Sequence, residues 1–589
     1  MRIIILILWY TVCMPHKALA VRSRANRGEV RPLKKSTNFK GIVQGQLRKE
    51  TTCRTYMIEF RGHYRDFREQ EFFDNLEFAL LSAKGTSTCN EQFVKEHIQR
   101  IWNSRKICIP DKSSAHVPLC VYIDTDADIN TVALAASRCS LLRSVSRLWG
   151  EGSTPESANE ACMENFDSII APTYYEDNNI NGKANDWRVS FRRYGRSAGW
   201  NTTEKVALLA KFNPTLKALG GDVDLKGAAH DLIYLEDWHS FHREMTLKEQ
   251  TRGRTRERHS TPRERIEGQV KAQDRDRDHG EYAPLKSILG EIIFEPVPVE
   301  SLFSLGKRPF LGTTSMTAVS AHLASVAANA GIGRRVLDPF CGTGSLILSS
   351  AYLGAEVVGS DIDATCIGLG HDDDDVSKFK NQNFRRYGAM EGFDQSNKST
   401  IDNFVHYGLA DQVGLLAGCD VQSWLSAFLN PNVPQMRPVY GGEGPLALPL
   451  APFDAICCDP PYSRRERASG AVQSSLELKQ EVPAAVSYPL SPHMGDPRQV
   501  LATLFQLAQV SLKPGGRLVF WFPSAAFLSE SEIREQLRAV ETVARGSLQQ
   551  ASPDFHEKKG MQLRLMRVTP EKMHDKLWRW LVVYEALTQ

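Results

Sequence analysis

The chain contains the stretch Arg334-Arg-Val-Leu-Asp338-Pro-Phe-Cys-Gly342-Thr-Gly344-Ser-Leu-Ile-Leu-Ser-Ser-Ala-Tyr-Leu353, in which a short apolar run leads through a glycine-containing turn into an amphipathic segment. This order predicts a β-strand, a tight turn and an α-helix, which together form the first βα unit of a doubly wound sheet. Glycine at 342 and 344 lets the backbone approach a bound ligand, because a Cβ at either position would obstruct it. We therefore expect an α/β fold with a ligand bound at this turn.

The residue types of the turn favour S-adenosylmethionine over a dinucleotide. A nicotinamide-binding turn has a third small residue where this chain has Ile347. The acidic Asp338, which precedes the glycines, also suits a cationic, phosphate-free cofactor better than a pyrophosphate. Another nucleotide, or a purely structural turn, is the alternative that the loop alone leaves open.

Two further apolar runs end in an acid. The run from Glu356 ends at Asp361, close to the roughly 20-residue spacing at which a carboxylate receives ribose hydroxyls. The run from Val413 ends at Asp420, which could accept the adenine amino group, although an acid at a strand end is also commonly structural. We predict that the cofactor is bound by Thr314, Asp338, Phe340, Gly342, Gly344, Asp361, Ile362, Asp420 and Val421.

The most specific motif is Phe453-Asp-Ala-Ile-Cys-Cys-Asp459-Pro460-Pro461-Tyr462, an apolar strand followed by an acid, two prolines and an aromatic ring. The exocyclic amine of a purine is a poor nucleophile, because its lone pair is delocalised into the ring. The Asp459 carboxylate and the Pro460 carbonyl can accept its two hydrogens and so aim the lone pair at a methyl sulfonium, while neither proline donates a competing N–H. Tyr462 can stack on a base flipped out of its helix. An ordinary turn is the alternative, and the predicted catalytic residues are Asp459, Pro460, Pro461 and Tyr462.

Later segments complete a sheet. An apolar stripe predicts a helix over 496–513, and the strand from Arg517 follows it. Ser529 and Glu532 have the spacing of a helix-capping box. The apolar runs 561–568 and 577–584 predict a closing antiparallel pair.

Several of these motifs, in this order, resemble the catalytic subunits of eukaryotic tRNA guanosine-10 N2-methyltransferases, of the THUMP-associated methyltransferase group. The resemblance covers the chain from about residue 53 to the end, except for a charged segment and an acidic loop, and Ser463 stands where the family has glycine. The stretches that carry it are Phe67-Arg-Glu-Gln-Glu71, Leu148-Trp-Gly-Glu-Gly152, Trp187-Arg-Val-Ser-Phe-Arg-Arg-Tyr-Gly195, Phe310-Leu-Gly-Thr-Thr-Ser315-Met, Asp338-Pro-Phe-Cys-Gly-Thr-Gly344, Gly359-Ser-Asp-Ile-Asp363, Asp459-Pro-Pro-Tyr-Ser-Arg-Arg-Glu466 and Arg579-Trp-Leu-Val-Val-Tyr-Glu585.

The resemblance implies a C-terminal Rossmann-like class I S-adenosylmethionine-dependent methyltransferase and an N-terminal α+β half with a THUMP-like domain that docks tRNA. It also implies a small zinc-binding activator subunit, of which the composition gives no sign. The residues add one observation of their own. Trp187, Val189 and Phe191 alternate with Arg188, Ser190 and Arg192, so one face of a strand can be core and the other a basic RNA-binding face, or else a solvated one.

Composition and the resemblance together set the expected domain boundaries. A chain of 589 residues with 42% hydrophobic residues is large enough for several folded domains. We expect an apolar, signal-like extension over 1–22, the RNA-docking region over 53–240, a disordered linker rich in arginine and acids over 241–285, and the methyltransferase domain over 286–589. The formal charge of +3 neither requires nor excludes a nucleic-acid partner.

Two other functions and two locations stay open. The Asp-Pro-Pro-Tyr motif does not by itself distinguish guanine N2 from adenine N6 in DNA or RNA, and an adaptor that binds tRNA without activity is a further alternative. The 12 cysteines contain no CxxC pair, which indicates free thiols in a reducing compartment and no zinc site. We therefore expect a cytoplasmic protein, with secretory or organellar targeting as the alternative if residues 1–20 act as a signal.

Overall fold

The computed structural model divides the chain into two compact units, which are described separately. Among the described residues, one unit holds 54–68 and 76–296, and the other holds 69–75 and 297–588. The structure describes residues 54–84, 88–111, 114–176, 186–195, 199–226, 228–238, 284–312, 315–363, 366–367, 398–429, 437–440, 452–461, 497–524, 527–551, 561–574 and 577–588.

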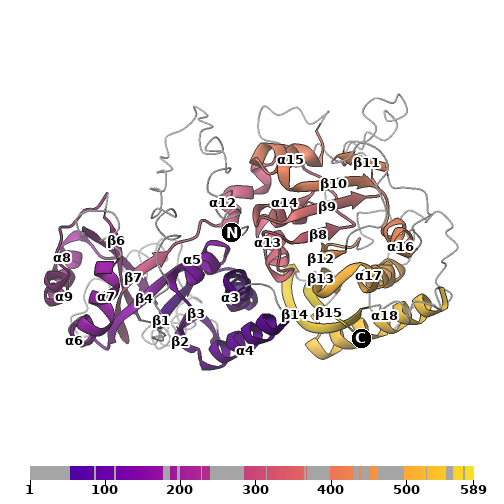
Figure 1. The fold of residues 1–589 in the computed structure, drawn as a ribbon. Helices are drawn as coiled ribbons and strands as arrows, with labels where there is room; N and C mark the ends of the chain where they lie inside the picture. Colours follow the sequence, from indigo (N-terminus) through magenta and orange to yellow (C-terminus); the bar gives the residue numbers. More distant parts are fainter. Residues whose placement is uncertain are drawn as a thin grey trace, which may run out of the picture. The chain divides into compact units, whose positions relative to one another are not determined.

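The N-terminal unit is built on a seven-stranded sheet in the order β2-β3-β1-β4-β7-β6-β5 (Figure 1). Five neighbouring pairs are antiparallel, and β5 runs parallel to β6. Its strands are β1 (Arg54–Phe60), β2 (Lys106–Asp111), β3 (Ser114–Thr125), β4 (Leu142–Gly152), β5 (Trp187–Tyr194), β6 (His230–Asp237) and β7 (Lys286–Phe294). The main helices before β7 are α3 (Arg68–Lys84), α4 (Thr88–Ser104), α5 (Ile129–Ser137), α6 (Pro155–Glu164), α7 (Ala171–Glu176), α8 (Thr202–Lys211) and α9 (Asn213–Leu219).

The boundary between the halves differs from the expected one. We placed residues 286–589 in the C-terminal domain, but β7 lies between β4 and β6 in the N-terminal sheet. Gly290 makes this possible, because a Cβ there would lie 2.4 Å from the carbonyl oxygen of Arg147 on β4. The charged segment therefore connects two neighbouring strands of one sheet. Residues 241–283 of that segment, and the signal-like residues 1–22, lie outside the described residues.

The C-terminal unit is built on an eight-stranded sheet in the order β11-β10-β9-β8-β12-β13-β15-β14. The strands β10, β9, β8, β12 and β13 are parallel, and β15 and then β14 follow as an antiparallel pair. The bounds are β8 (Arg335–Asp338), β9 (Glu356–Asp361), β10 (Val413–Gly418), β11 (Arg437–Tyr440), β12 (Phe453–Cys458), β13 (Leu512–Ser524), β14 (Gln562–His574) and β15 (Leu577–Leu587). This order confirms the predicted Rossmann-like α/β class and the closing antiparallel pair.

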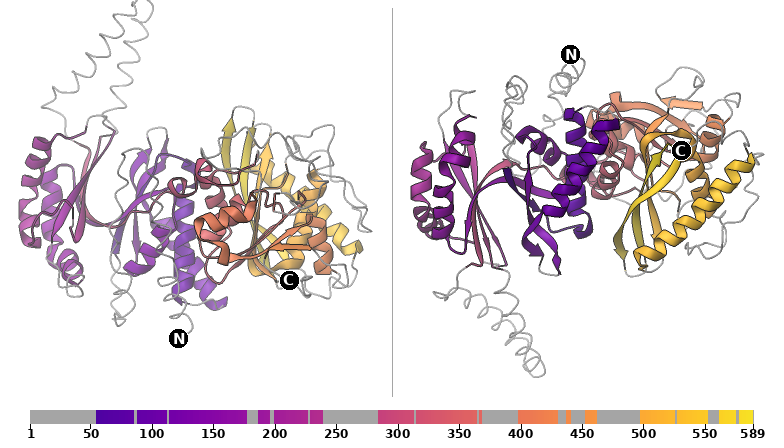
Figure 2. Two further views of the ribbon diagram at one scale, coloured as in Figure 1. Left: turned by 90° about the horizontal axis from the view of Figure 1, so that it is seen from above. Right: turned by 60° about the horizontal axis from the view of Figure 1, so that its bottom comes forward.

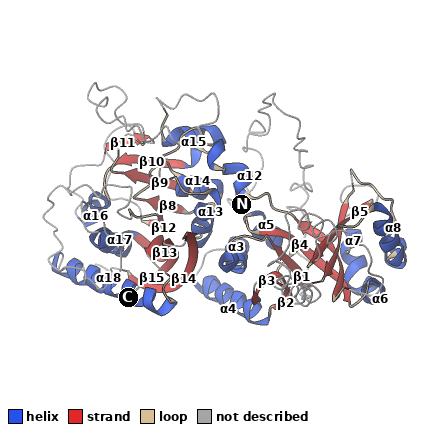
Figure 3. Ribbon diagram, turned by 180° about the vertical axis from the view of Figure 1, so that it is seen from behind, coloured by secondary structure: helices blue, strands red, loops and turns tan. Residues whose placement is uncertain are grey.

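Helices cover both faces of this sheet (Figure 3). On one face α13 packs on α14, and on the other α16, α17 and α18 pack in series, with the long α18 along β14 (Figure 2). The capping box is confirmed, since the Ser529 N–H donates to Glu532 Oε2 at 2.6 Å ahead of α18. The helices are α12 (Val299–Phe303), α13 (Ala318–Ala327), α14 (Ser345–Tyr352), α15 (Thr400–Tyr407), α16 (Val421–Leu429), α17 (Pro497–Ser511) and α18 (Glu530–Ala551).

The connections of the sheet identify where a ligand can bind. The chain passes from β8 to β9 and β10 on one side and then crosses to β12 on the other side of β8. In an open parallel sheet, ligands bind at the carboxyl ends of the strands where the order reverses in this way. The carboxyl ends of β8 and β12 carry Asp338 and Asp459. None of the helices in the described ranges is long and apolar enough to cross a membrane.

Candidate active site

The turn after β8 has the conformation that its glycines require. Gly342 and Gly344 have φ values of +48° and +78°, in the region that side-chain-bearing residues rarely adopt. A Cβ on Gly342 would meet nothing closer than Asp361 Oδ2 at 3.9 Å, so this part of the turn leaves room for a ligand. A Cβ on Gly344 would instead lie 2.7 Å from Thr400 Cγ2. Gly344 is therefore needed for packing inside the protein, which differs from the ligand-approach role that we expected.

The close approach of α14 to the sheet depends on a glycine of the strand. Ile347, which stands where a dinucleotide-binding helix has a small residue, is fully buried. Its Cδ1 would lie 2.8 Å from a Cβ on Gly359 of β9. In this chain the small residue at the helix–strand contact is therefore Gly359 on β9, and the large residue is Ile347 on α14.

Asp338 and Asp361 bind the turn from two neighbouring strands. Asp338 is 1% exposed, and its Oδ1 accepts the N–H of Phe340 at 3.0 Å. Asp361 Oδ2 accepts the N–H of Gly342 at 2.7 Å, and its Oδ1 accepts the N–H of Asp363 at 2.9 Å. The two carboxylates therefore fix the backbone of the turn from both sides.

These carboxylates lie in an electrostatic environment that favours a cation. Burial raises the pKa of Asp338 well above its ordinary value, and the charges of Asp361 and Asp459 raise it further. Burial also raises the pKa of Asp361. A positively charged ligand beside them would offset both the desolvation and the mutual repulsion.

The predicted amine-binding motif follows β12, next to the glycine turn. Asp459 is half-buried, Pro460 is buried and Pro461 is partly exposed. Since Ile456 of β12 pairs with Leu337 of β8, Asp459 and Asp338 emerge at the same edge of the sheet from adjacent strands. Tyr462 and Thr314 lie outside the described residues, so the structure does not place these two side chains.

The remaining predicted cofactor residues fall into two groups. Ile362 is 52% exposed at the end of β9, where an apolar side chain can cover the face of a base, and Phe340 is partly buried against the core. Asp420 Oδ1 accepts the N–H and hydroxyl of Ser423, at 2.8 and 2.7 Å, which fixes the Asp420 side chain at the start of α16. The side chain of Val421 is 6% exposed and packs in the core, which leaves its backbone for any ligand contact.

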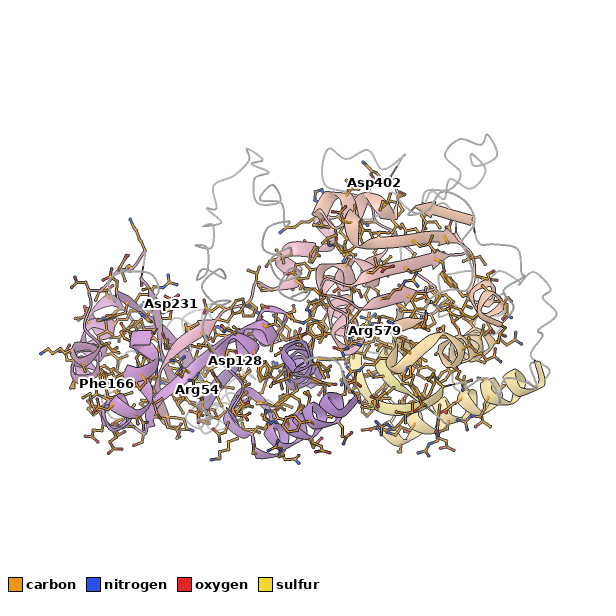
Figure 4. All side chains as sticks on the ribbon, viewed as in Figure 1. Arg54, Asp128, Phe166, Asp231, Asp402 and Arg579 are labelled. Carbon is orange, nitrogen blue, oxygen red and sulfur yellow. The ribbon has the colours of Figure 1, made fainter. Side chains whose placement is uncertain are left out.

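Two positioning residues had no sequence signal. Asn403 Nδ2 donates to the carbonyls of Phe310 and Thr343, at 3.0 and 3.1 Å, and its Oδ1 accepts the Phe310 N–H at 3.0 Å. Thr400 Oγ1 donates to the Gly342 carbonyl at 2.7 Å. Both lie on α15, whose first turn contains Asp402, the partner of the N-cap residue Ser399 in a capping box (Figure 4). The capping box predicts the helix, but no spacing indicates which structure its side chains will meet.

The arginines of β5 are paired with acids. Arg188 pairs with Asp231 (Figure 4), and Arg193 Nε donates to Glu236 at 2.9 Å. Arg192 is 8% exposed and pairs with Glu59 and Glu295. The alternation along β5 therefore places positive charge on acidic partners of the same unit, and Arg192 in particular points inward instead of forming part of a basic face.

Sequence comparison matches the chain to tRNA (guanine(10)-N(2))-methyltransferases from several organisms. The chain is 25% identical over 496 residues to the tRNA (guanine(10)-N(2))-methyltransferase TRMT11 of Dictyostelium discoideum, which spans 81% of this chain and 76% of that protein. It is 32% identical over 228 residues to the enzyme of the same name from Xenopus laevis, a match that spans 38% of this chain and 39% of that protein. The chain thus spans about two fifths of the length of that vertebrate relative.

Comparisons of other kinds add little. No family model matches the chain. Among solved structures, TrmN from Thermus thermophilus is 14% identical, with a TM-score of 0.32 over 90% of this chain and 100% of that chain. The sequence matches alone confirm the resemblance to tRNA guanosine-10 N2-methyltransferases.

Proposed function

We propose that this chain transfers a methyl group from S-adenosylmethionine to the exocyclic N2 amine of the guanosine at position 10 of tRNA. One observation carries the proposal: Asp459 and Pro460 leave β12 at the sheet edge where the glycine turn and Asp338 leave the adjacent β8. Paired strands are about 4.8 Å apart. An amine held by Asp459 and Pro460 would therefore lie beside a cofactor held by the glycine turn and Asp338. The names of the matched relatives agree with this activity.

The residues of the turn fit the cofactor. Among the described residues, no atom lies closer than 3.9 Å to a Cβ built on Gly342, which leaves room for the cofactor. The carboxylates of Asp338 and Asp361 suit its positive charge, and exposed Ile362 suits its adenine ring. Thr314, Phe340, Asp420 and the backbone of Val421 complete the proposed cofactor site. When bound, S-adenosylmethionine supplies an electrophilic methyl carbon on a positively charged sulfur.

The protein's own residues orient the nucleophile. The Asp459 carboxylate accepts one hydrogen of the amine and the Pro460 carbonyl accepts the other. This geometry draws the nitrogen out of conjugation with the ring and points its lone pair toward the methyl carbon. Pro461 fixes the turn, and Tyr462 stacks on the flipped guanine. The Asp459 carboxylate also stabilises the positive charge that develops on the nitrogen and takes the proton late in the reaction.

The other parts of the chain have proposed roles in the same reaction. Residues 53–240, together with β7, form a THUMP-like region that docks tRNA, and a small zinc-binding subunit activates the methyltransferase half, residues 297–589. The site of action is the cytoplasm, in keeping with a sequence whose 12 cysteines contain no CxxC pair. Purification with and without such a subunit, followed by activity measurement on unmodified tRNA, tests its role: equal activity in both preparations would contradict it.

Nucleoside analysis tests the proposed reaction. Unmodified tRNA is incubated with the protein and radiolabelled S-adenosylmethionine, then digested and separated. We expect label in N2-methylguanosine, and none in tRNA whose position 10 is not guanosine. Label in N6-methyladenosine would replace the proposed amine with adenine N6, and cofactor binding without any transfer would favour the inactive adaptor.

Replacing Asp338 with asparagine separates cofactor binding from stability. A carboxyl group whose folded-state pKa is raised stabilises the fold at a pH below its unfolded-state pKa, and this contribution is lost as the pH rises through the folded-state value. Asp338→Asn should therefore raise the unfolding temperature of the unliganded protein by a few degrees at pH 8. That gain should shrink as the pH falls toward the usual carboxyl pKa of about 4. Affinity for S-adenosylmethionine should fall about ten-fold or more, measured by calorimetry.

Asp454, on the strand that leads to Asp459, provides the matched control. It forms ion pairs with Arg334 and Lys513, at 3.4 and 2.8 Å. Asp454→Asn should lower the unfolding temperature at pH 8 and leave cofactor affinity unchanged. An Asp338→Asn protein that is less stable at pH 8 and binds the cofactor normally would show that Asp338 is only a structural residue.

A further inference from the structure

The antiparallel end of the C-terminal sheet extends beyond the proposed amine clamp. Phe520 of β13 pairs with Cys458, the last residue of β12, whereas β13 continues to Ser524, which pairs with Trp578 of β15. At about 3.3 Å per residue, Ser524 lies roughly 13 Å further along the strand direction. This end of β13 and β15 therefore projects past the edge from which Asp459 emerges.

The projecting end carries apolar side chains in solvent. Phe527 is 58% exposed, Met573 is 45% exposed and Trp578 is partly exposed. The rings of Phe527 and Trp578 lie 4.9 Å apart at an interplanar angle of 67°. We call Phe527 and Trp578 the aromatic tip. Single exposed apolar residues are common, but exposed aromatic rings in mutual contact beside a ligand-binding edge point to a binding surface.

The rings rest on a rigid support. Trp580 is 2% exposed and lies 5.7 Å from the Phe527 ring, and its Nε1–H donates to Ser524 Oγ at 3.2 Å. Next to it, Arg579 (Figure 4) pairs with Glu571, and its guanidinium lies 4.2 Å from the Trp521 ring centroid. Side chains that are already fixed lose little conformational entropy on binding.

A positive charge lies beside the rings. Lys572 of β14 pairs directly with Trp578 in the strand ladder, so the two side chains project from the same face, and Lys572 is exposed. An aromatic ring beside an ammonium group suits a nucleobase and its phosphate, because every base stacks on aromatic rings and the phosphate attracts the charge. These features favour a nucleic acid over an uncharged apolar protein surface.

We propose that the aromatic tip stacks a nucleobase of the RNA strand next to the methylated guanosine, with Lys572 at its phosphate. The inference rests on the proposed function and adds a substrate-positioning surface to it. Flipping the target base breaks its stacking on neighbouring bases. A platform on the same sheet edge that stacks a flanking base would replace part of that interaction and hold the strand open at the site.

Substitutions of Phe527 test the proposal, with KM and kcat for tRNA as readouts. Phe527→Ala should raise KM about ten-fold and change kcat by less than about two-fold, because the residue does not touch the reacting atoms. Phe527→Tyr should behave like the wild type, whereas Phe527→Leu, which keeps apolar volume without an aromatic ring, should behave like the alanine variant. Val405→Ala, at an apolar side chain that is 62% exposed on α15, serves as the control and should have no effect.

A binding measurement distinguishes failure of this inference from failure of the proposed function. The Kd of the full-length protein for unmodified tRNA is measured by anisotropy over a range of salt concentrations. Phe527→Ala should weaken binding about ten-fold, and Lys572→Gln should reduce the slope of log Kd against log salt by about one. If Phe527→Ala bound tRNA with the same Kd as the wild-type protein, the stacking role would be wrong, whether or not the protein methylates tRNA. If Phe527→Ala lost a copurifying protein subunit instead of RNA affinity, the tip would be a protein-docking site and the proposal would be wrong.

Discussion

Replacing Asp459 with alanine is expected to lower kcat for tRNA methylation by about 100-fold or more, while affinity for S-adenosylmethionine stays close to that of the wild type. The carboxylate has its effect on the amine and on the charge that develops there, so its loss removes an interaction made mainly in the transition state. In the proposed site the turn after β8 holds the cofactor, and the hydrogen bonds of this turn to Asp338 and Asp361 do not involve Asp459. Single-turnover rates and calorimetry measure the two effects independently.

An exposed acid of the same unit provides the control for Asp459. Asp411 is exposed in the short 3-10 helix before β10, and Asp411→Ala should leave both kcat and cofactor affinity unchanged. Full activity in Asp459→Ala would remove this carboxylate from the mechanism. A large loss of cofactor affinity in the same variant would assign Asp459 to the cofactor site instead of the amine.

Replacing Gly344 with alanine is expected to destabilise the protein by about 3 kcal/mol and to abolish measurable cofactor binding. An alanine at this positive φ costs about 1 kcal/mol or more relative to glycine. Its Cβ would also lie 2.7 Å from Thr400 Cγ2 and 3.3 Å from Phe404 Cε2, which is too close without a shift of the neighbouring atoms. The overlap can be relieved only if α15 or the turn moves. Either movement disturbs the turn, because Thr400 Oγ1 is hydrogen-bonded to the Gly342 carbonyl. Denaturant unfolding gives the stability change.

Two further variants separate the backbone cost from the packing cost. Gly333 has almost the same φ, +76°, but a Cβ there would meet no atom within 4 Å, so Gly333→Ala should cost only about 1 kcal/mol. Thr400→Ser removes Cγ2 and keeps the hydroxyl that donates to Gly342. Combined with Gly344→Ala, it should restore part of the lost stability. Equal effects of the two glycine substitutions, with no rescue by Thr400→Ser, would contradict the packing explanation.

Much of the C-terminal half could be predicted from the sequence because its determinants are local. The glycine turn, the apolar strands that end in acids and the helix-capping signal each specify their own conformation, and the strand order follows from the rules of doubly wound sheets. The ends of β8 and β12, which carry the two predicted motifs, lie at one edge of the sheet. Gly359 shows the limit of such reasoning, since its contact with Ile347 joins two elements whose packing distance no local pattern encodes.

What could not be predicted depended on partners far away in the chain. β7 was assigned to the wrong half, because a charged segment marks a connection but does not specify which sheet the next strand joins. The arginines of β5 alternate as a basic face would, yet Glu59 of β1 draws Arg192 into the interior. Asn403 binds the segment at Phe310 only because α15 folds over the turn.

The most direct test of the amine clamp is a structure of the protein with a non-reactive S-adenosylmethionine analogue and a tRNA whose guanosine 10 is unmodified. We predict that the guanine is flipped from the tRNA, with its N2 about 3 Å from the Asp459 carboxylate and from the Pro460 carbonyl, and aimed at the position of the transferable methyl group. A bound guanine whose N2 contacts neither group, or a cofactor analogue that binds away from Asp338 and Gly342, would contradict the account.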